Sequence, residues 1–204
     1  MPLVLLIRHG ENEFTRTGKL AGWTKGVNLN EAGRKQAEGL VERLKGAPIK
    51  FIYSSPLERA RETAAPLAAA RGLPVAIRPG LGEVQYGQWT GKSLKVLGRT
   101  KLWKVVQQLP STMRFPEGET MRGAQMRMVD AIDEIVRAHP SPKAVVALFT
   151  HSDPIKLAVA HYLGMPLDLF QRLMISTASV TVLRLGHGQP GLVKLNETGP
   201  MAAR

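Results

Sequence analysis

Two segments of the chain place a histidine close behind a run of apolar residues. The first run, residues 3–7, is followed by Arg8 and His9, and the second, residues 144–149, is followed after one threonine by His151. In an open parallel sheet, ligands bind where the strands end. A neutral imidazole is a competent nucleophile towards phosphorus, and arginine gives planar, multidentate recognition of a tetrahedral anion. These residue types at strand ends indicate a site for a phosphoryl group.

Another arginine, Arg59, lies in the first turn of a helix that we expect to follow the apolar residues 49–53. A cation in that turn opposes the helix dipole, which favours negative charge there. The position is explained if an anion lies at the helix end, where free backbone N–H groups point outward. The alternative is an ion pair with a surface carboxylate such as Glu62, and the sequence leaves both interpretations open.

Glu83 lies between glycines in residues 82–87 and is the natural candidate for an acid. Transfer of a phosphoryl group from an ester needs a proton for the leaving alkoxide. The two histidines, Glu83 and Asp153 are also metal-capable side chains. The arginines would compete with a cation, however, and no short His/Asp ligand spacing occurs. We therefore expect no metal at this site.

The composition restricts the class of protein further. The 204 residues include no cysteine, which excludes disulfides and a thiolate nucleophile, and 44% are hydrophobic, enough for a substantial core. The N-terminal apolar run is too short for a signal peptide and is followed by charge. We expect a soluble cytoplasmic protein that has no membrane partner.

The net charge of +12 is concentrated in one segment. Residues 84–116 contain no acidic residue but do contain basic ones, namely Lys92, Lys95, Arg99, Lys101, Lys104 and Arg114. This segment either forms a solvated face, steers anionic substrates or binds a partner. The segment carries no aromatic-basic stacking motif and no known fingerprint of nucleic-acid-binding proteins, so we expect no specific nucleic-acid partner.

Strand-like and helix-like patterns alternate along the chain. Strands are predicted at residues 3–7, 49–53, 75–77, 144–149, 180–185 and 191–195. Helices are predicted from a cap at Asn30 to Gly46, from a capping box at residues 55–58 to Gly72, within residues 92–109, and in segments that end near Ala138 and Leu163. The alternation predicts an α/β protein, a three-layer α/β/α sandwich around a mostly parallel sheet. We expect one domain, residues 1–204, with a small helical cap inserted around residues 92–116.

Four separated motifs resemble the histidine phosphatase superfamily, which is also called phosphoglycerate mutase-like. They occur in the order found in that family and cover nearly the whole chain. The motifs are Arg8-His9-Gly10-Glu11, Ser54-Ser55-Pro56-Leu57-Glu58-Arg59-Ala60, Leu81-Gly82-Glu83 followed by Tyr86-Gly87, and Thr150-His151.

The resemblance implies a role for each of these polar residues. His9 would be the nucleophile that becomes phosphohistidine, and Arg8, Arg59 and His151 would hold the phosphoryl oxygens. Glu83 would act as general acid and then as base for the water that hydrolyses the intermediate. The resemblance also implies that no metal or organic cofactor is used.

The chain departs from the family pattern after the first motif. The family commonly has a threonine or serine and later an asparagine there, whereas this chain has Asn12 and Thr15. Both types of side chain can donate to a phosphate oxygen, so Asn12 and Thr15 are expected to bind substrate.

The remaining polar and aromatic residues have simpler interpretations. We expect Asp153 to be a helix N-cap, with a minor orienting role left open. We expect the three tryptophans to serve packing, although Trp89 could line the pocket.

The family contains both phosphatases and mutases. The mutases carry an Arg-Arg-Ser element after the acid, which residues 101–106 lack, and the turn at residues 118–120 is similar to that of phosphatases. We therefore expect a metal-independent phosphomonoesterase that acts on small phosphorylated metabolites through a phosphohistidine intermediate. The alternative is a phosphotransferase of the cofactor-dependent phosphoglycerate mutase type. The sequence fixes neither the substrate nor the oligomeric state, and a homodimer is compatible with it.

Overall fold

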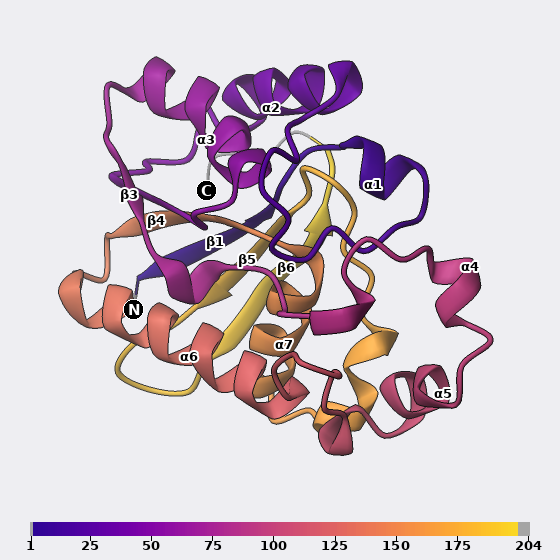
Figure 1. Ribbon diagram of the computed structural model, residues 1–204. Helices are drawn as coiled ribbons and strands as arrows, with labels where there is room; N and C mark the ends of the chain where they lie inside the picture. Colours follow the sequence, from indigo (N-terminus) through magenta and orange to yellow (C-terminus); the bar gives the residue numbers. More distant parts are fainter. Residues whose placement is uncertain (1, 200–204) are drawn as a thin grey trace.

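The computed structural model describes residues 2–199, and within them six strands form one sheet in the order β3-β2-β4-β1-β5-β6 (Figure 1). The strands are β1 (Leu3–Arg8), β2 (Phe51–Ser54), β3 (Val75–Ile77), β4 (Val145–Thr150), β5 (Val180–Arg184) and β6 (Gly191–Glu197). The first four are parallel to one another, whereas β5 runs antiparallel to β1 and β6 antiparallel to β5. The expected parallel sheet and closing hairpin are both present.

Helices cover both faces of this sheet (Figure 1). They are α1 (Glu13–Arg16), α2 (Glu31–Arg43), α3 (Glu58–Arg71), α4 (Leu94–Leu97), α5 (Lys101–Gln108), α6 (Met121–Ala138) and α7 (Ser152–Tyr162). Short 3₁₀ turns lie at Pro79–Leu81, Gly87–Trp89, Pro110–Thr112 and Leu167–Arg172. Helices α2 and α3 pack on one face, and α6 and α7 pack on the other. The predicted three-layer α/β architecture is therefore confirmed.

Strand β1 shows why the chain forms these layers. Its alternate residues Val4 and Leu6 pack with α6 and α7, while Leu5 and Ile7 pack with α2 and α3. All four are buried, and each contributes roughly 1.5–3 kcal/mol by leaving water. A strand enclosed on both faces can expose polar residues only where it ends, so Arg8 and His9 lie at the edge of the sheet.

Two helix starts differ from the sequence expectation. The sequence predicts that a capping box at residues 55–58 starts helix α3. The helix instead begins at Glu58, and the side chain of the preceding residue, Leu57, forms no capping hydrogen bond. The Ser55 hydroxyl, expected to cap the helix, lies 2.8 Å from His151 Nε2 instead. Asp153 is not an N-cap either, because α7 starts at Ser152 and Asp153 lies inside its first turn. In both cases the polar side chain contacts a residue of another element, namely His151 for Ser55 and Tyr86 for Asp153.

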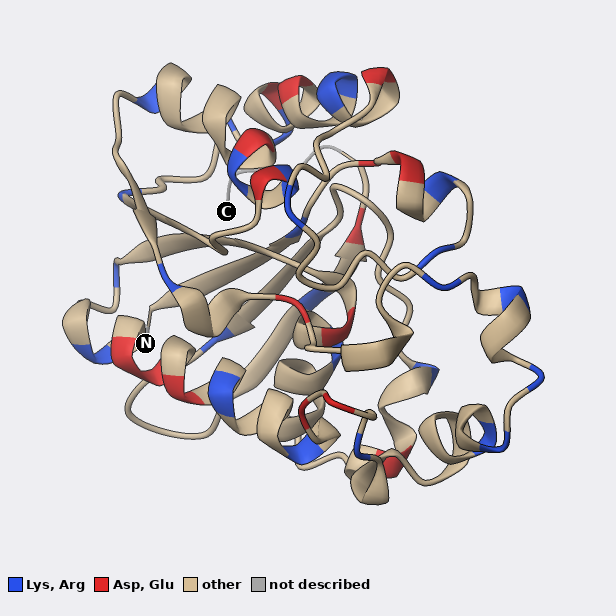
Figure 2. Ribbon diagram, viewed as in Figure 1, with Lys and Arg blue, Asp and Glu red and all other residues tan. Residues whose placement is uncertain are grey.

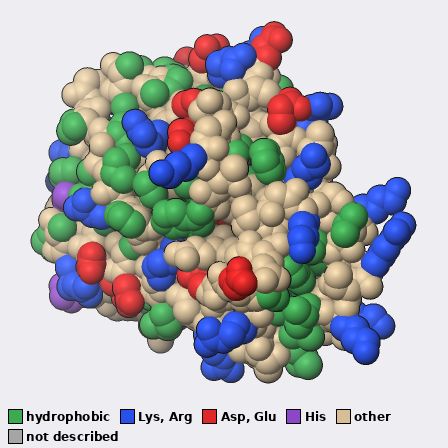
Figure 3. Space-filling view, viewed as in Figure 1, with side chains coloured by type: hydrophobic (Ala, Val, Ile, Leu, Met, Phe, Trp, Pro, Cys, Tyr) green, Lys and Arg blue, Asp and Glu red, His purple; other side chains and the backbone are tan. Residues whose placement is uncertain are grey.

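The segment expected to be one helical cap over residues 92–109 forms two short helices. Gly98 ends α4, and the Thr100 side chain caps α5 by accepting a hydrogen bond from Trp103 N. The six basic side chains of residues 84–116 are all exposed. Figure 2 shows the basic residues along α4 and α5, and in Figure 3 they project from the same side of the molecule. Within the described residues, no helix is both long and apolar enough to cross a membrane.

Candidate active site

The two histidines of the sequence motifs meet because β1 and β4 are adjacent and in register. Arg8 pairs with Thr150 across the parallel ladder, and the next backbone hydrogen bond joins His9 N to Thr150 O at 3.0 Å. His9 and His151 therefore leave the sheet side by side. Their ring centroids are 5.1 Å apart, with the planes inclined at 60°.

His9 is held in a form that suits a nucleophile. Its Nδ1 lies 2.7 Å from the carbonyl oxygen of Gly10. A carbonyl can only accept, so Nδ1 carries the proton and Nε2 keeps a lone pair. Burial, together with the nearby Arg59 and Arg8 guanidinium groups, lowers the pKa of His9 well below its ordinary value. The ring is therefore neutral at physiological pH.

His151 is placed by the serine that follows β2. Ser55 Oγ accepts a hydrogen bond from Leu57 N at 3.3 Å and lies 2.8 Å from His151 Nε2. The hydroxyl can then donate its own proton to Nε2, which leaves the proton of the imidazole on Nδ1. That Nδ1 is buried and has no partner among the described residues. Burial and then Arg59 lower the pKa of His151 well below its ordinary value.

Arg59 is one of the largest fully buried side chains, only 1% exposed. Its Nη2 donates to the backbone oxygen of Gly22 at 2.9 Å, while Nε and Nη1 have no partner among the described residues. The alternative of a surface ion pair with Glu62 is wrong, because Glu62 accepts from Leu29 N at 2.7 Å. A buried guanidinium without a carboxylate partner is costly unless an anion joins it.

Arg8 completes the cationic side of the site. Its Nη1 donates to the backbone oxygen of Ile175 at 2.6 Å, and its Nε is buried without a partner in residues 2–199. Burial lowers the pKa of Arg8, although the nearby Glu83 and Asp153 raise it. The Nη1 contact fixes the guanidinium of Arg8, and Arg8 lines the same pocket as Arg59.

Asn12 and Thr15 form a reciprocal cap at the start of α1. Asn12 Oδ1 accepts from Thr15 N at 3.0 Å, and Thr15 Oγ1 accepts from Asn12 N at 3.0 Å. The Thr15 hydroxyl also donates to Asn12 O at 2.8 Å, so its proton is already used. Asn12 Nδ2, by contrast, is buried and has no partner in the described part of the chain. Both residues line the pocket, but only the Asn12 amide is free to donate to a ligand.

Glu83 is the carboxyl group of the site. Its Oε1 accepts from Val84 N at 2.9 Å, and Trp23 Nε1 donates to its backbone oxygen at 2.5 Å. Burial raises the pKa of Glu83 to about 7, and the nearby Asp153 adds to this effect while Arg59 acts against it. The carboxyl group can therefore hold or release a proton near neutral pH.

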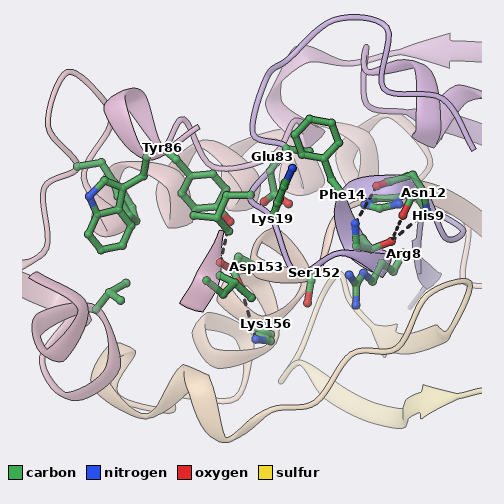
Figure 4. Close-up of a pocket in the computed structure, with 18 of the residues that line it drawn as sticks. Arg8, His9, Asn12, Phe14, Lys19, Glu83, Tyr86, Ser152, Asp153 and Lys156 are labelled. Carbon is green, nitrogen blue, oxygen red and sulfur yellow. Dashed lines mark hydrogen bonds and ion pairs between the residues drawn. The ribbon is translucent and has the colours of Figure 1, made fainter. Parts of the chain in front are cut away.

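These residues surround one pocket with a volume of about 270 Å³ (Figure 4). In Figure 4, Arg8, His9 and Asn12 gather at one end, Glu83, Lys19, Asp153 and Lys156 lie near the middle, and Tyr86 lies further from His9. Further lining residues are Phe14, Lys19, Glu83, Tyr86, Trp89, Trp103, Gln107, Phe115, Ser152 and Gln171. The structure thus brings together all the site residues expected from the sequence, with His151 directly behind His9.

Sequence reasoning missed the far side of the pocket. Tyr86 donates its hydroxyl to Asp153 Oδ2 at 2.9 Å, a contact between residues 67 positions apart. Trp89 and Trp103 stack with centroids 6.1 Å apart and both line the pocket, a position that the sequence left open for Trp89 but did not predict for Trp103. The one available signal was that Tyr86 belongs to the same motif as Glu83. Among residues 2–199, no group of three or more His, Asp or Glu side chains is arranged to hold a metal ion.

Comparison with known proteins agrees with this geometry. Residues 4–198 match the family model of the histidine phosphatase superfamily, branch 1. The chain is 27% identical to phosphoserine phosphatase 1 of Hydrogenobacter thermophilus, over 97% of this chain and 93% of that protein. It is 30% identical to a 2,3-bisphosphoglycerate-dependent phosphoglycerate mutase of Thermoplasma acidophilum, over 93% of this chain and 90% of that protein.

A solved structure extends the likeness to three dimensions. The fold superposes on a mycobacterial glucosyl-3-phosphoglycerate phosphatase with a TM-score of 0.87, at 26% identity and over 96% of this chain and 98% of that one. The family model, the phosphoserine phosphatase and the glucosyl-3-phosphoglycerate phosphatase support an enzyme of the phosphatase type. The chain belongs to branch 1 of the histidine phosphatase superfamily.

Proposed function

We propose that the protein is a metal-independent phosphomonoesterase that acts on small phosphorylated metabolites through a phosphohistidine intermediate on His9. One observation carries the proposal. Five buried nitrogen atoms of the site residues have no partner among the described residues: Arg8 Nε, Asn12 Nδ2, Arg59 Nε, Arg59 Nη1 and His151 Nδ1. Arg8, Asn12 and Arg59 line the same pocket as His9, and the His151 ring lies 5.1 Å from the His9 ring. A set of N–H donors without a carboxylate suits a tetrahedral oxyanion, which offers many acceptors.

In the first step, the lone pair of His9 Nε2 attacks phosphorus and the bond from phosphorus to the ester oxygen breaks. The leaving oxygen takes the proton of Glu83, and the arginines hold the phosphoryl oxygens. In the second step, Glu83 as carboxylate takes a proton from water while the water oxygen attacks phosphorus. The P–N bond breaks, His9 recovers its lone pair, inorganic phosphate leaves, and Glu83 is protonated again.

The size of the pocket supports a small substrate. Its volume of about 270 Å³ lies below the range of roughly 300–1,000 Å³ typical of pockets for drug-sized ligands. The relatives named for phosphoserine and glucosyl-3-phosphoglycerate act on small phosphate esters. Trp103 and Gln107 of the cap and Lys19 of the preceding loop also line the pocket, and we expect them to contact the organic group of such an ester.

The first experiment measures release of inorganic phosphate from a panel of phosphomonoesters in the presence of a chelator, with 3-phosphoglycerate included. We expect chelator-resistant release that His9→Ala abolishes, because covalent catalysis has no substitute nucleophile at this place. The matched control is His161→Ala, which removes an exposed histidine of α7 and should leave the rate unchanged. A wild-type rate in His9→Ala would refute the assignment.

A mutase remains the second candidate, since a bisphosphoglycerate-dependent mutase is among the relatives at 30% identity. The two activities differ in whether water or a bound phosphoglycerate receives the phosphoryl group. Interconversion of 3- and 2-phosphoglycerate after addition of a bisphosphate primer, without release of phosphate, would favour the mutase.

A further inference from the structure

Asp153 occupies a position in the pocket that the reaction described above does not use. It lies in the first turn of α7, two residues after His151, and its side chain is 20% exposed. Its Oδ2 accepts the Tyr86 hydroxyl at 2.9 Å, and its Oδ1 lies 3.4 Å from Lys156 Nζ. Figure 4 shows these contacts near the middle of the pocket, and Glu83 lines the same pocket beside them.

Charged groups reach Glu83 from several elements. Arg8 of β1 and Arg59 of α3 favour its ionised form. On α6, Arg127 donates to the backbone oxygen of Glu83 at 3.2 Å. Arg8 and Arg59 favour loss of the proton that a general acid must hold, whereas burial, and after it Asp153, favour its retention. Arg127 is itself paired with Glu119 Oε1 at 2.7 Å, and Asp153 is the carboxylate that opposes the effect of Arg8 and Arg59 on Glu83.

The polar but uncharged neighbours do not offset these cations. His9 and His151 are neutral, because burial lowers the pKa of each ring. Tyr86 stays protonated, since burial and the nearby Asp153 raise its pKa well above its ordinary value. A carboxylate can only accept, so the Tyr86 proton points to Asp153 and the phenol oxygen offers only lone pairs to the pocket.

We propose that Asp153 is a positioning residue for the general acid: its carboxylate, fixed by Tyr86 and Lys156, keeps the proton on Glu83 until the leaving group takes it. The inference rests on the proposed function, because it presumes that Glu83 protonates a leaving oxygen. Lys156 acts against Asp153 by neutralising part of its charge. That ammonium is itself held by Gln171 Oε1 at 3.2 Å.

Two substitutions should move the pH profile in opposite directions. Asp153→Asn removes the negative charge with almost no change of shape, so Glu83 should ionise at lower pH. The alkaline limb of kcat for an alkyl phosphate is then expected to move down by about one pH unit. Lys156→Gln removes the cation that neutralises Asp153, and the same limb should move up.

Two controls separate this role from a structural one. Asp153→Glu keeps the charge and should restore the wild-type limb. An aryl phosphate, whose leaving group needs no proton, should show no shift of the limb in any variant. Thermal unfolding of each variant reports whether it is folded, and Lys156→Gln provides the test if Asp153→Asn does not fold.

The outcomes distinguish the inference from the function on which it rests. If the wild-type protein releases no phosphate, or Glu83→Gln keeps the alkaline limb, the proposed function or its acid is wrong. If that limb depends on Glu83 but stays in place in both Asp153→Asn and Lys156→Gln, the role of Asp153 is refuted. If the limb moves down in Asp153→Asn and up in Lys156→Gln, and does so only with the alkyl phosphate, the role of Asp153 is established.

Discussion

His9 and Glu83 are both buried, and burial prepares each of them for its step. Removal from water disfavours the charged form of any group, so it lowers the pKa of His9 and raises that of Glu83. The histidine therefore keeps the lone pair that attacks phosphorus, and the glutamate keeps the proton that the leaving oxygen needs. One physical cause thus produces a nucleophile and an acid in the same pocket.

At the residue scale, Glu83→Gln tests the acid through the choice of leaving group. Glutamine keeps the acceptor for Val84 N but cannot give up a proton. We expect hydrolysis of alkyl phosphates to fall by a factor of about 10² or more, and that of an activated aryl phosphate to fall far less. Steady-state rates on the two substrates at one pH measure the difference. Equal losses on both would place the acid elsewhere.

The same substitution has a consequence for stability. The pKa of Glu83 is about 7 in the folded protein against an ordinary value of 4.5, so the folded state binds the extra proton. The free energy of unfolding that this proton contributes is fully present below pH 4.5 and is lost as pH rises through 7. Relative to wild type, Glu83→Gln should gain up to about 3 kcal/mol between pH 5 and pH 8. Urea unfolding without phosphate at the two pH values measures it, and an equal difference at both would contradict the raised pKa.

At the element scale, α2 supports the loop that follows His9. A Cβ added at Gly33 of α2 would overlap the backbone oxygen of Glu11, whereas one added at Gly39 of the same helix meets nothing. Gly33→Ala should therefore destabilise the protein by about 1–3 kcal/mol and lower kcat by displacing Asn12. Gly39→Ala should stabilise it by up to about 1 kcal/mol. Denaturant unfolding and phosphate release compare them, and a neutral Gly33→Ala would show that the loop can shift freely.

Strands that are buried on both faces can be predicted from the sequence. The continuous apolar run at residues 144–149, for example, is typical of an inner strand of a sheet. Helix starts are less readable, because local patterns compete with distant contacts. Residues 55–58 fit a capping box, yet the Ser55 hydroxyl contacts His151, which is 96 positions away. In the same way, the apolar spacing within residues 92–109 did not reveal the break at Gly98.

At the scale of the whole molecule, the motif residues were predictable and their surroundings were not. Two motifs place a histidine where β1 and β4 end, and the other two place Arg59 in the first turn of α3 and Glu83 after a 3₁₀ turn. The Tyr86–Asp153 contact and the two pocket tryptophans depend on how the cap and α7 pack against each other, which no local pattern encodes. The structure therefore brings the predicted residues together and adds the Tyr86–Asp153 contact and Trp103, which the sequence did not predict.

The uneven charge of the molecule has a kinetic consequence. The basic side chains of residues 84–116 are exposed on α4, α5 and their flanks, and residues of both helices, Leu94 and Trp103, line the pocket. A positive field at a pocket mouth raises the local concentration of anions, and salt screens it over about 8–10 Å. Substrate capture should therefore depend on ionic strength, while the chemical step should not.

The double variant Lys95→Gln with Lys101→Gln isolates this field. At low salt we expect kcat/KM for a phosphomonoester to fall about threefold with kcat unchanged, and the difference from wild type to vanish near 0.5 M salt. Lys50→Gln with Lys143→Gln removes the same charge at the opposite edge of the sheet, where β2 and β4 begin, and should have little effect. Equal losses in the two double variants would mean that net charge matters rather than its position. A loss independent of salt would instead mean that the cap lysines contact substrate directly.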